Sequence, residues 1–204
     1  MTSLSDFARH KLESLDTGSL RRSLRDVPAL GINFCSNDYL GLSQDLRLKA
    51  AAVAAVERYG AGAGASRLVT GNHPLYGELE RKIAGLKGTE AALVFGSGYL
   101  ANLGTIPAVV GAGDLIVADE LSHACMISGA RLSGARVELF RHNDAGHLNF
   151  LLRSNRGGAR HCLVMTEGVF SMDGDLSPLA DIAAITRDHD GWLMIDDAHG
   201  FGVV

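Results

Sequence analysis

Apolar and polar residues alternate along most of this chain in two periods, one typical of helices and one typical of buried strands. Short apolar runs predict strands at 91–95, 115–118, 137–140, 162–166 and 192–195. Segments with a period near 3.6 residues predict helices between them, at 99–110, 123–132, 146–153 and 178–188. Because strands and helices alternate at this spacing, the sequence predicts βαβ units and an α/β fold with a mostly parallel sheet.

The first part of the chain has a less regular pattern. It predicts an amphipathic helix over 4–15, a short strand over 32–36, and two more helices over 45–58 and 73–86. No linker or repeat interrupts the chain after residue 40. We therefore expect an N-terminal arm with a short strand at 1–40 and one larger domain at 41–204.

Composition narrows the class of protein. The chain has 204 residues, of which 47% are hydrophobic and 21% charged, as in a globular domain with a core of ordinary size. Its net charge is -4 with scattered Lys and Arg, so we expect neither a nucleic-acid nor a membrane partner. The start of the chain has no secretory pattern and no apolar stretch is long enough to span a bilayer, which favours a cytoplasmic location.

The most informative polar residues follow the last apolar run. Asp196 and His199 come directly after 192–195, where a strand of a parallel sheet delivers side chains to its carboxyl edge. A carboxylate at the end of a buried strand needs a cation or several donors, because burying it alone is costly. A protonated ring nitrogen of a cofactor would meet that need, and a helix-capping acid is the alternative.

A second candidate lies between a predicted strand and a predicted helix. Ser97, Gly98 and Tyr99 stand where free backbone amides and the helix dipole can hold a phosphate, although such glycines also occur for steric reasons alone. The third glycine of a dinucleotide fingerprint is replaced by Ala101, and no Lys-Ser/Thr pair of a P-loop follows. A single phosphate therefore fits this turn better than a nucleotide.

Two further segments carry polar groups. His123 stands at a predicted helix start, where an imidazole either caps the helix or lies against a flat ligand and exchanges a proton. The long loop at 166–175 follows another strand and is rich in Glu, Ser and Asp. Asp173 and Asp175 lack the other ligands of a calcium loop, so we predict no metal site. The cysteines at 35, 125 and 162 have no spacing typical of a zinc site or a disulfide framework.

These segments occur together in an order that resembles one enzyme family. The chain is similar over essentially all its length to the α-oxoamine synthases, which are pyridoxal-phosphate (PLP) enzymes of fold type I. The segments that carry the resemblance are Ser36-Asn37-Asp38-Tyr39-Leu40-Gly41-Leu42, Gly64 to His73, Ser97-Gly98-Tyr99, Leu121-Ser122-His123-Ala124, Thr166 to Asp175, and Asp196-Asp197-Ala198-His199-Gly200.

The resemblance implies the large PLP-binding domain of a fold-type-I transferase and a role for each candidate at the cofactor. Asp196 would pair with the pyridine nitrogen and keep it protonated, and His123 would stack on the ring and contact substrate. Ser171 and His199 would hydrogen-bond the phenolic oxygen of the ring. Catalytic roles thus fall to His123, Asp196 and His199.

The same resemblance implies the remaining contacts. Ser97, Gly98 and Tyr99 would receive the phosphate of PLP. Arg21 and Asn37 would bind the carboxylate of substrate or product, for which the planar fork of arginine is well suited.

The implied activity is that of an acyltransferase. It would condense L-alanine with a pimeloyl thioester, carried on coenzyme A or acyl carrier protein, with loss of carbon dioxide, as a step of biotin biosynthesis in a homodimeric enzyme. Within the family, aminolevulinate synthases and 2-amino-3-ketobutyrate ligases use glycine with other thioesters, and a serine-specific enzyme is a further alternative. A nucleotide-binding α/β domain is disfavoured because no complete GxGxxG unit is present.

The family also has a lysine beyond the Asp-Ala-His segment that binds the cofactor covalently. The lysines of this chain are Lys11, Lys49, Lys82 and Lys87, and all precede that segment. The sequence therefore predicts an incomplete large domain that is inactive by itself. A non-catalytic fragment that binds PLP weakly, or that associates with a longer synthase, is the corresponding alternative.

Overall fold

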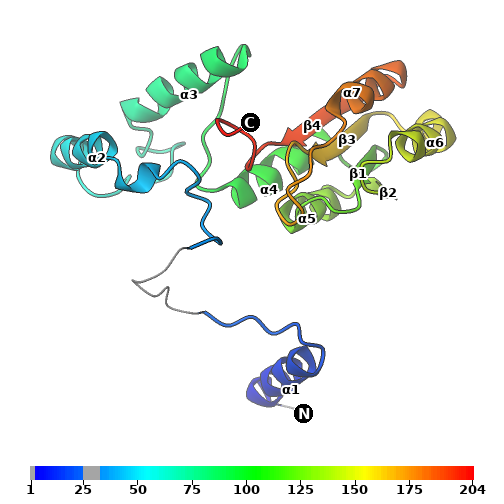
Figure 1. Cartoon of the computed structure of the whole chain (residues 1–204), viewed down its shortest axis with the longest axis horizontal. Coiled ribbons are helices and arrows are strands. Elements are labelled where there is room, and N and C mark those ends of the chain that lie inside the picture. The colour runs from blue at the N-terminus through cyan, green and yellow to red at the C-terminus, as the bar shows by residue number, and fades with distance from the viewer. Residues whose placement is uncertain (1–2, 25–32) are drawn as a thin grey trace. The chain divides into compact units, whose positions relative to one another are not determined.

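The computed structural model describes residues 3–24 and 33–204, and the chain separates into two compact units between Ser36 and Asn37 (Figure 1). The N-terminal unit contains helix α1 (Leu4–Thr17), close to the predicted range. The hydroxyl of Ser3 caps it by accepting a hydrogen bond from the N–H of Asp6 at 3.1 Å. The domain boundary at residue 40 remains a prediction.

The strand predicted over 32–36 is not formed by the part of it that the structure describes. Residues 33–36 form a turn, and Ile32 lies outside the described residues. The side-chain oxygen of Asn33 accepts a hydrogen bond from the N–H of Cys35 at 2.9 Å. An asparagine that bonds the backbone two residues ahead favours a turn over a strand, which explains the difference.

The second unit contains every described strand and the remaining helices. It begins with the short 3-10 helix η1 (Leu42–Gln44), followed by α2 (Leu46–Tyr59) and α3 (Pro74–Lys87). Helices and strands then alternate as α4 (Gly98–Val109), β1 (Leu115–Asp119), α5 (Ala124–Ser133), β2 (Arg136–Phe140), α6 (Ala145–Asn155), η2 (Arg156–Gly158), β3 (Cys162–Glu167), α7 (Leu179–Asp188) and β4 (Trp192–Asp196). This order confirms the predicted α/β class.

The four strands form one parallel sheet in the order β2-β1-β3-β4. The central strands β1 and β3 are buried along their whole length, whereas the outer strands β2 and β4 are partly exposed. Since all strands run in the same direction, their carboxyl ends meet at one edge. That edge carries the candidate site.

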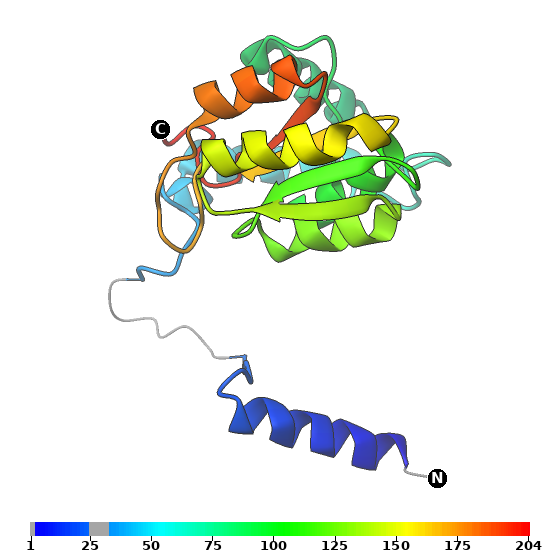
Figure 2. The same ribbon diagram turned by 90° about the vertical axis from the view of Figure 1, so that its right-hand side faces the viewer.

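Helices cover both faces of the sheet. In β1, Ile116 and Ala118 pack with α4 and α5, whereas Leu115 and Val117 point to the opposite face and pack with α6 and α7. Figure 2 shows α6 and α7 on one side of the sheet and α5 on the other. The alternation of side chains along a strand thus divides the core into two apolar layers.

The apolar run at 91–95 was predicted as a strand, and this is wrong in the structure, where the run pairs with no described strand. Its backbone groups bond to side chains instead. The N–H of Val94 donates to the carboxylate of Glu80 at 2.9 Å, and the carbonyl oxygen of Val94 accepts from Arg67 at 3.1 Å. Because these groups are already satisfied, the segment is extended without joining the sheet.

Within residues 3–24 and 33–204, no helix combines the length and the apolar character required to cross a membrane. In the same part of the chain, no group of three or more His, Cys, Asp or Glu side chains is arranged to hold a metal ion.

Candidate active site at the carboxyl edge of the sheet

The carboxyl ends of three neighbouring strands each carry an acidic residue. Asp119 ends β1, Glu167 ends β3 and Asp196 ends β4, and Glu167 lies opposite Asp196 in the sheet register. Asp119 and Glu167 are buried and Asp196 is partly exposed. Carboxylates concentrated at this edge need donors or cations, which the adjoining helices supply in part.

A cavity of about 110 Å³ opens beside Asp196. It is lined by residues from the starts of α4 and α5 and from the ends of β3 and β4, namely Gly98, Tyr99, His123, Cys125, Glu167, Asp196, Ala198 and His199. The structure therefore brings five of the predicted site residues together: Gly98, Tyr99, His123, Asp196 and His199.

The carboxylate of Asp196 is held by two neutral donors. Its Oδ2 accepts a hydrogen bond from the Asn102 side-chain amide at 2.8 Å, and its Oδ1 accepts from the N–H of Ala198 at 3.1 Å. Among the described residues, no Lys, Arg or His forms an ion pair with it. Asp197 differs, because its carboxylate pairs with Lys87 at 2.9 Å and does not line the cavity. Asp196 is thus a negative charge that faces the cavity with no cationic partner in the described chain.

Asn102 contacts both Asp196 and Cys125, and neither Asn102 nor Cys125 was among the predicted site residues. Asn102 is buried in α4, and its amide nitrogen also lies 3.3 Å from the sulfur of Cys125. Its side-chain oxygen is buried with no hydrogen-bond partner among the described residues. Burial raises the pKa of the Cys125 thiol, so this group stays protonated at neutral pH. A polar residue on the apolar face of the predicted helix was the available signal for Asn102.

The start of α4 presents free backbone donors. The Ser97 hydroxyl caps the helix by accepting from the N–H of Leu100 at 3.1 Å. No acceptor among the described residues meets the N–H groups of Gly98 and Tyr99, which line the cavity. Unpaired amides at the start of a twelve-residue helix favour an anion.

His123 and Glu167 are linked through the backbone. The carboxylate of Glu167 accepts the main-chain N–H of His123 at 2.6 Å, which fixes the start of α5. Nδ1 of His123 accepts from the N–H of Cys125 at 3.2 Å, so Nε2 is the nitrogen that can carry a proton. Burial is the main reason why the pKa of Glu167 is raised, and the nearby Asp196 raises it further.

His199 joins this cavity to a second hollow. Its Nδ1 lies 2.6 Å from the hydroxyl oxygen of Tyr39, a residue that the sequence did not single out for the site. Tyr39, Ser171 and His199 all line the adjoining hollow of about 240 Å³. Ser171 therefore lies near His199 but does not line the cavity beside Asp196.

The two predicted substrate-binding residues belong to different units of the chain. Arg21 belongs to the N-terminal unit, where its guanidinium pairs with Asp16 at 2.6 Å. Asn37 is exposed, two residues before Tyr39, and does not line either hollow. The structure leaves their role as a prediction.

These groups define the kind of ligand that the cavity can hold. A carboxylate without a cation suits a protonated nitrogen, free helix amides suit an anionic group, and the exposed imidazole of His123 can lie against a flat ring. A flat cationic heterocycle with an anionic substituent satisfies all three conditions.

Comparison with known proteins shows the class to which this fold and site belong. Residues 30–204 match the model of the family "Aminotransferase class I and II". The chain belongs to this family.

Individual proteins that are similar to this chain carry a more specific name than the family. The chain is 55% identical to an 8-amino-7-oxononanoate synthase of Maricaulis maris over 99% of its own length and 54% of that protein. It is 56% identical to an 8-amino-7-oxononanoate synthase of Methylobacterium nodulans over 99% of its length and 56% of that protein. The chain thus spans about half the length of the curated relatives it matches.

Solved structures agree with this fold. A serine palmitoyltransferase of Sphingomonas wittichii superposes with a TM-score of 0.79 at 30% identity, covering 94% of this chain and 51% of that chain. An 8-amino-7-oxononanoate synthase of Francisella tularensis gives a TM-score of 0.69 at 31% identity, with 84% and 46% covered. A structure of SPT with a PLP internal aldimine gives 0.76 at 33% identity, with 79% and 40% covered.

Proposed function

We propose that this chain supplies the PLP-binding part of an 8-amino-7-oxononanoate synthase. That enzyme is an acyltransferase of biotin biosynthesis, which condenses L-alanine with a pimeloyl thioester of coenzyme A or acyl carrier protein. The observation that carries the proposal is the cavity beside Asp196, because residues from four separate elements bring a carboxylate, an imidazole and unpaired helix amides together there. The names of the curated relatives support the particular synthase.

Each residue of the cavity has a distinct role in binding PLP. When bound, PLP supplies an electron-withdrawing ring that stabilises negative charge at the α-carbon of the amino acid. Asp196 holds a proton at the pyridine nitrogen, and Asn102 keeps the carboxylate in place with its 2.8 Å hydrogen bond. The amides of Gly98 and Tyr99, with the α4 cap at Ser97, bind the phosphate.

The side chains at the rim orient the ring and the substrate. His123, which lines the cavity, would lie against the ring face, with Nε2 as the nitrogen available to carry a proton. His199, fixed by the hydroxyl of Tyr39, and Ser171 in the adjoining hollow bind the phenolic oxygen. Arg21 and Asn37 bind the substrate carboxylate in this proposal.

Equilibrium binding of PLP tests the cofactor assignment. We expect the substitution Asp196→Asn to weaken binding about tenfold or more, because it removes a charge-assisted hydrogen bond to the ring nitrogen. Asp197→Asn is the matched control, since it removes the same charge one residue later from a carboxylate that pairs with Lys87 outside the cavity. Equal losses in both variants, or no loss in either, would contradict the assignment.

Product analysis tests the substrates. Because the 204-residue chain is expected to be inactive by itself, the assay uses a full-length synthase that contains it. That enzyme, loaded with PLP, is incubated with pimeloyl-CoA and L-alanine, and 8-amino-7-oxononanoate is sought by mass spectrometry. Glycine with succinyl-CoA or acetyl-CoA, and serine with palmitoyl-CoA, are the alternative pairs. Product from one of these pairs and none from L-alanine would assign the chain to another synthase of the same kind.

We also propose that the enzyme is a cytoplasmic homodimer. Apolar side chains on α2 and α3, among them Leu46, Val53, Val56, Leu75 and Leu79, are exposed in the single chain. Exposed apolar surface of this kind suits an interface with a second copy. Light scattering of the full-length synthase after size-exclusion chromatography would give twice the mass of its chain if this is right, and the mass of one chain if it is wrong.

A further inference from the structure

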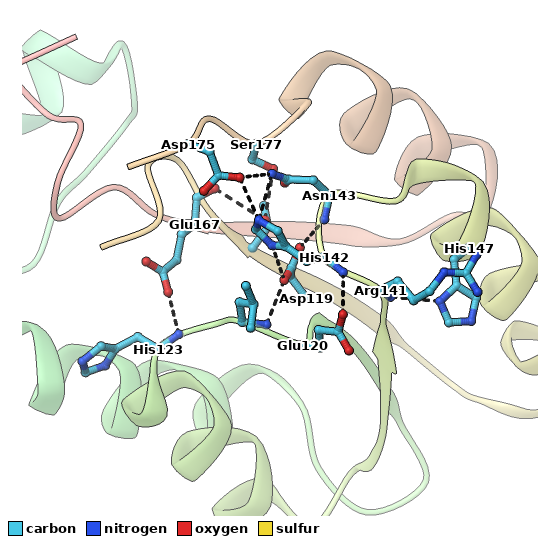
Figure 3. A network of polar contacts seen from close by, with 12 residues as sticks. Asp119, Glu120, His123, Arg141, His142, Asn143, His147, Glu167, Asp175 and Ser177 are labelled. Atoms are coloured by element: carbon cyan, nitrogen blue, oxygen red, sulfur yellow. Dashed lines mark hydrogen bonds and ion pairs between the residues drawn. The ribbon is translucent and has the colours of Figure 1, made fainter. Parts of the chain in front are cut away.

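His142, in the turn after β2, lies between two carboxylates from different parts of the chain (Figure 3). Its Nδ1 is 3.0 Å from Oδ1 of Asp119, and its Nε2 is 2.7 Å from Oδ2 of Asp175. An ionised carboxylate only accepts hydrogen bonds, so two such partners favour a ring that donates from both nitrogens. Nδ2 of Asn143 also lies 3.2 Å from Nε2. Contact of both ring nitrogens with carboxylates favours the doubly protonated, positively charged form of the imidazole.

The Asp119 end of this bridge is deeply buried. The side chain of Asp119 has no exposed area, and its two oxygens also accept the N–H groups of Leu121 and Asn143, each at 2.9 Å. No Lys or Arg among the described residues pairs with it. His142 is thus the cation that balances a carboxylate that would be costly to bury alone.

The Asp175 end belongs to the loop at 168–178, between β3 and α7. Oδ2 of Asp175 also accepts the side-chain amide of Asn143 at 2.7 Å. The ring of Phe170, in the same loop, meets the His142 ring edge-on with centroids 4.4 Å apart. His142 therefore contacts the loop at two positions that flank Ser171.

The other charged groups near His142 do not compete with its contacts to Asp119 and Asp175. Glu120 accepts the main-chain N–H of His142 at 3.0 Å, which adds negative charge on the side of β1. Arg141 points to a different partner, Asp144, at 2.6 Å. Burial by itself lowers the pKa of His142, but the hydrogen bonds to Asp119 and Asp175 outweigh it and the pKa is raised.

We propose that His142 is a positioning residue whose charged ring pins the 168–178 loop to the buried end of β1 and so fixes Ser171 beside the cavity. The role of Ser171 at the cofactor rests on the function proposed above, whereas the pinning of the loop does not. A group whose pKa is raised on folding stabilises the fold below its unfolded pKa, and this contribution is lost as pH rises through the folded pKa. The loop should therefore loosen when His142 loses its proton.

The test is made on the 204-residue chain with two readouts. NMR follows the His142 ring between pH 5 and 9, and hydrogen exchange gives protection factors for loop amides with internal partners: those of Phe170, Gly174 and Ser177. We expect the ring to titrate above the ordinary histidine pKa of about 6.5. Protection factors should fall about tenfold as pH passes through that value, because a charge-assisted hydrogen bond is lost.

Asp175→Asn and Asp173→Asn form a matched pair in one loop. Asp173 is exposed and makes no hydrogen bond or ion pair within the part of the chain that the structure describes. We expect Asp175→Asn to lower the His142 pKa and to lower loop protection at pH 6, whereas Asp173→Asn changes neither. His142→Gln should give low protection at every pH, and the rest of the sheet should remain protected in all variants.

A His142 ring that titrates at or below the ordinary value, or loop protection equal in both Asp variants, overturns the proposal. PLP binding, measured on the same samples at pH 6, distinguishes a failure of the pinning proposal from a failure of the proposed function. If the wild-type chain binds no PLP but the loop responds as stated, the cofactor assignment fails and the pinning role stands. If PLP binds equally to wild type and Asp175→Asn while the loop loosens, the effect on Ser171 and the cofactor is refuted.

Discussion

Close packing between α4 and α5 sets the distance between the two helix starts that line the cavity, and Gly129 lies at this contact. A Cβ placed on Gly129 would lie 2.9 Å from the backbone oxygen of Asn102 and 2.9 Å from Cδ1 of Ile106. Ile106 is buried and the Asn102 oxygen belongs to the backbone, so neither can move aside without moving α4. Gly129→Ala should therefore push α4 and α5 apart.

The size of the effect follows from two opposing contributions. Replacing a helical glycine by alanine stabilises the helix by about 1 kcal/mol. Overpacking a core contact costs roughly 1–3 kcal/mol. The matched control is Gly104→Ala, on the exposed side of α4, where the new Cβ meets only the half-exposed ring of Phe95 at 3.1 Å. That ring can rotate away, so the control keeps the helix gain.

Urea unfolding gives the free energy of unfolding of both variants. We expect Gly129→Ala to be less stable than Gly104→Ala by about 1–3 kcal/mol and to bind PLP more weakly, since Gly98 and His123 are displaced relative to each other. Equal stabilities of the two variants would refute the argument that the contact at Gly129 sets the helix spacing.

Three other experiments have defined outcomes. Because burial raises the pKa of Glu167, wild type loses stability as pH rises from the ordinary glutamate pKa to the raised one, so the stability of Glu167→Gln relative to wild type should increase over that range. A difference in urea midpoint that does not change with pH would contradict this. Burial raises the pKa of Cys162 to about 11, whereas Cys35 is exposed. A thiol reagent should therefore label Cys35 first and Cys162 only after unfolding, and mass spectrometry counts the labels. Tyr39→Phe removes the hydroxyl bonded to His199 and should weaken PLP binding about threefold to tenfold in a titration. Unchanged affinity would show that this contact does not orient His199.

The sequence predicted the parts of the fold that depend on local periodicity. The apolar runs that became β1 and β3 are buried throughout, and the helices between them cover both faces of the sheet, so the alternation alone indicated a parallel sheet. The run at 91–95 was misread because an apolar run does not reveal whether a neighbouring strand is available. At Val94 the side chains of Arg67 and Glu80 take the backbone bonds instead.

The sequence likewise predicted only some residues of the candidate site. Asp196 and the helix start at Gly98 were visible, because each stands directly after a strand or before a helix. Tyr39 was not, since it reaches His199 across 160 positions and only the tertiary fold brings them together. The bridge of His142 was also hidden, because it depends on the register of three strand ends and on a loop that turns back toward β1.

We propose that the carboxylate of Asp196 holds a proton on the pyridine nitrogen of PLP. The most direct test is the 15N chemical shift of ring-labelled PLP bound to the chain, compared between wild type and Asp196→Asn at pH 7.5. We expect a protonated ring nitrogen in wild type and an unprotonated one in the variant. An unprotonated nitrogen in wild type, or the same shift in both proteins, would contradict it.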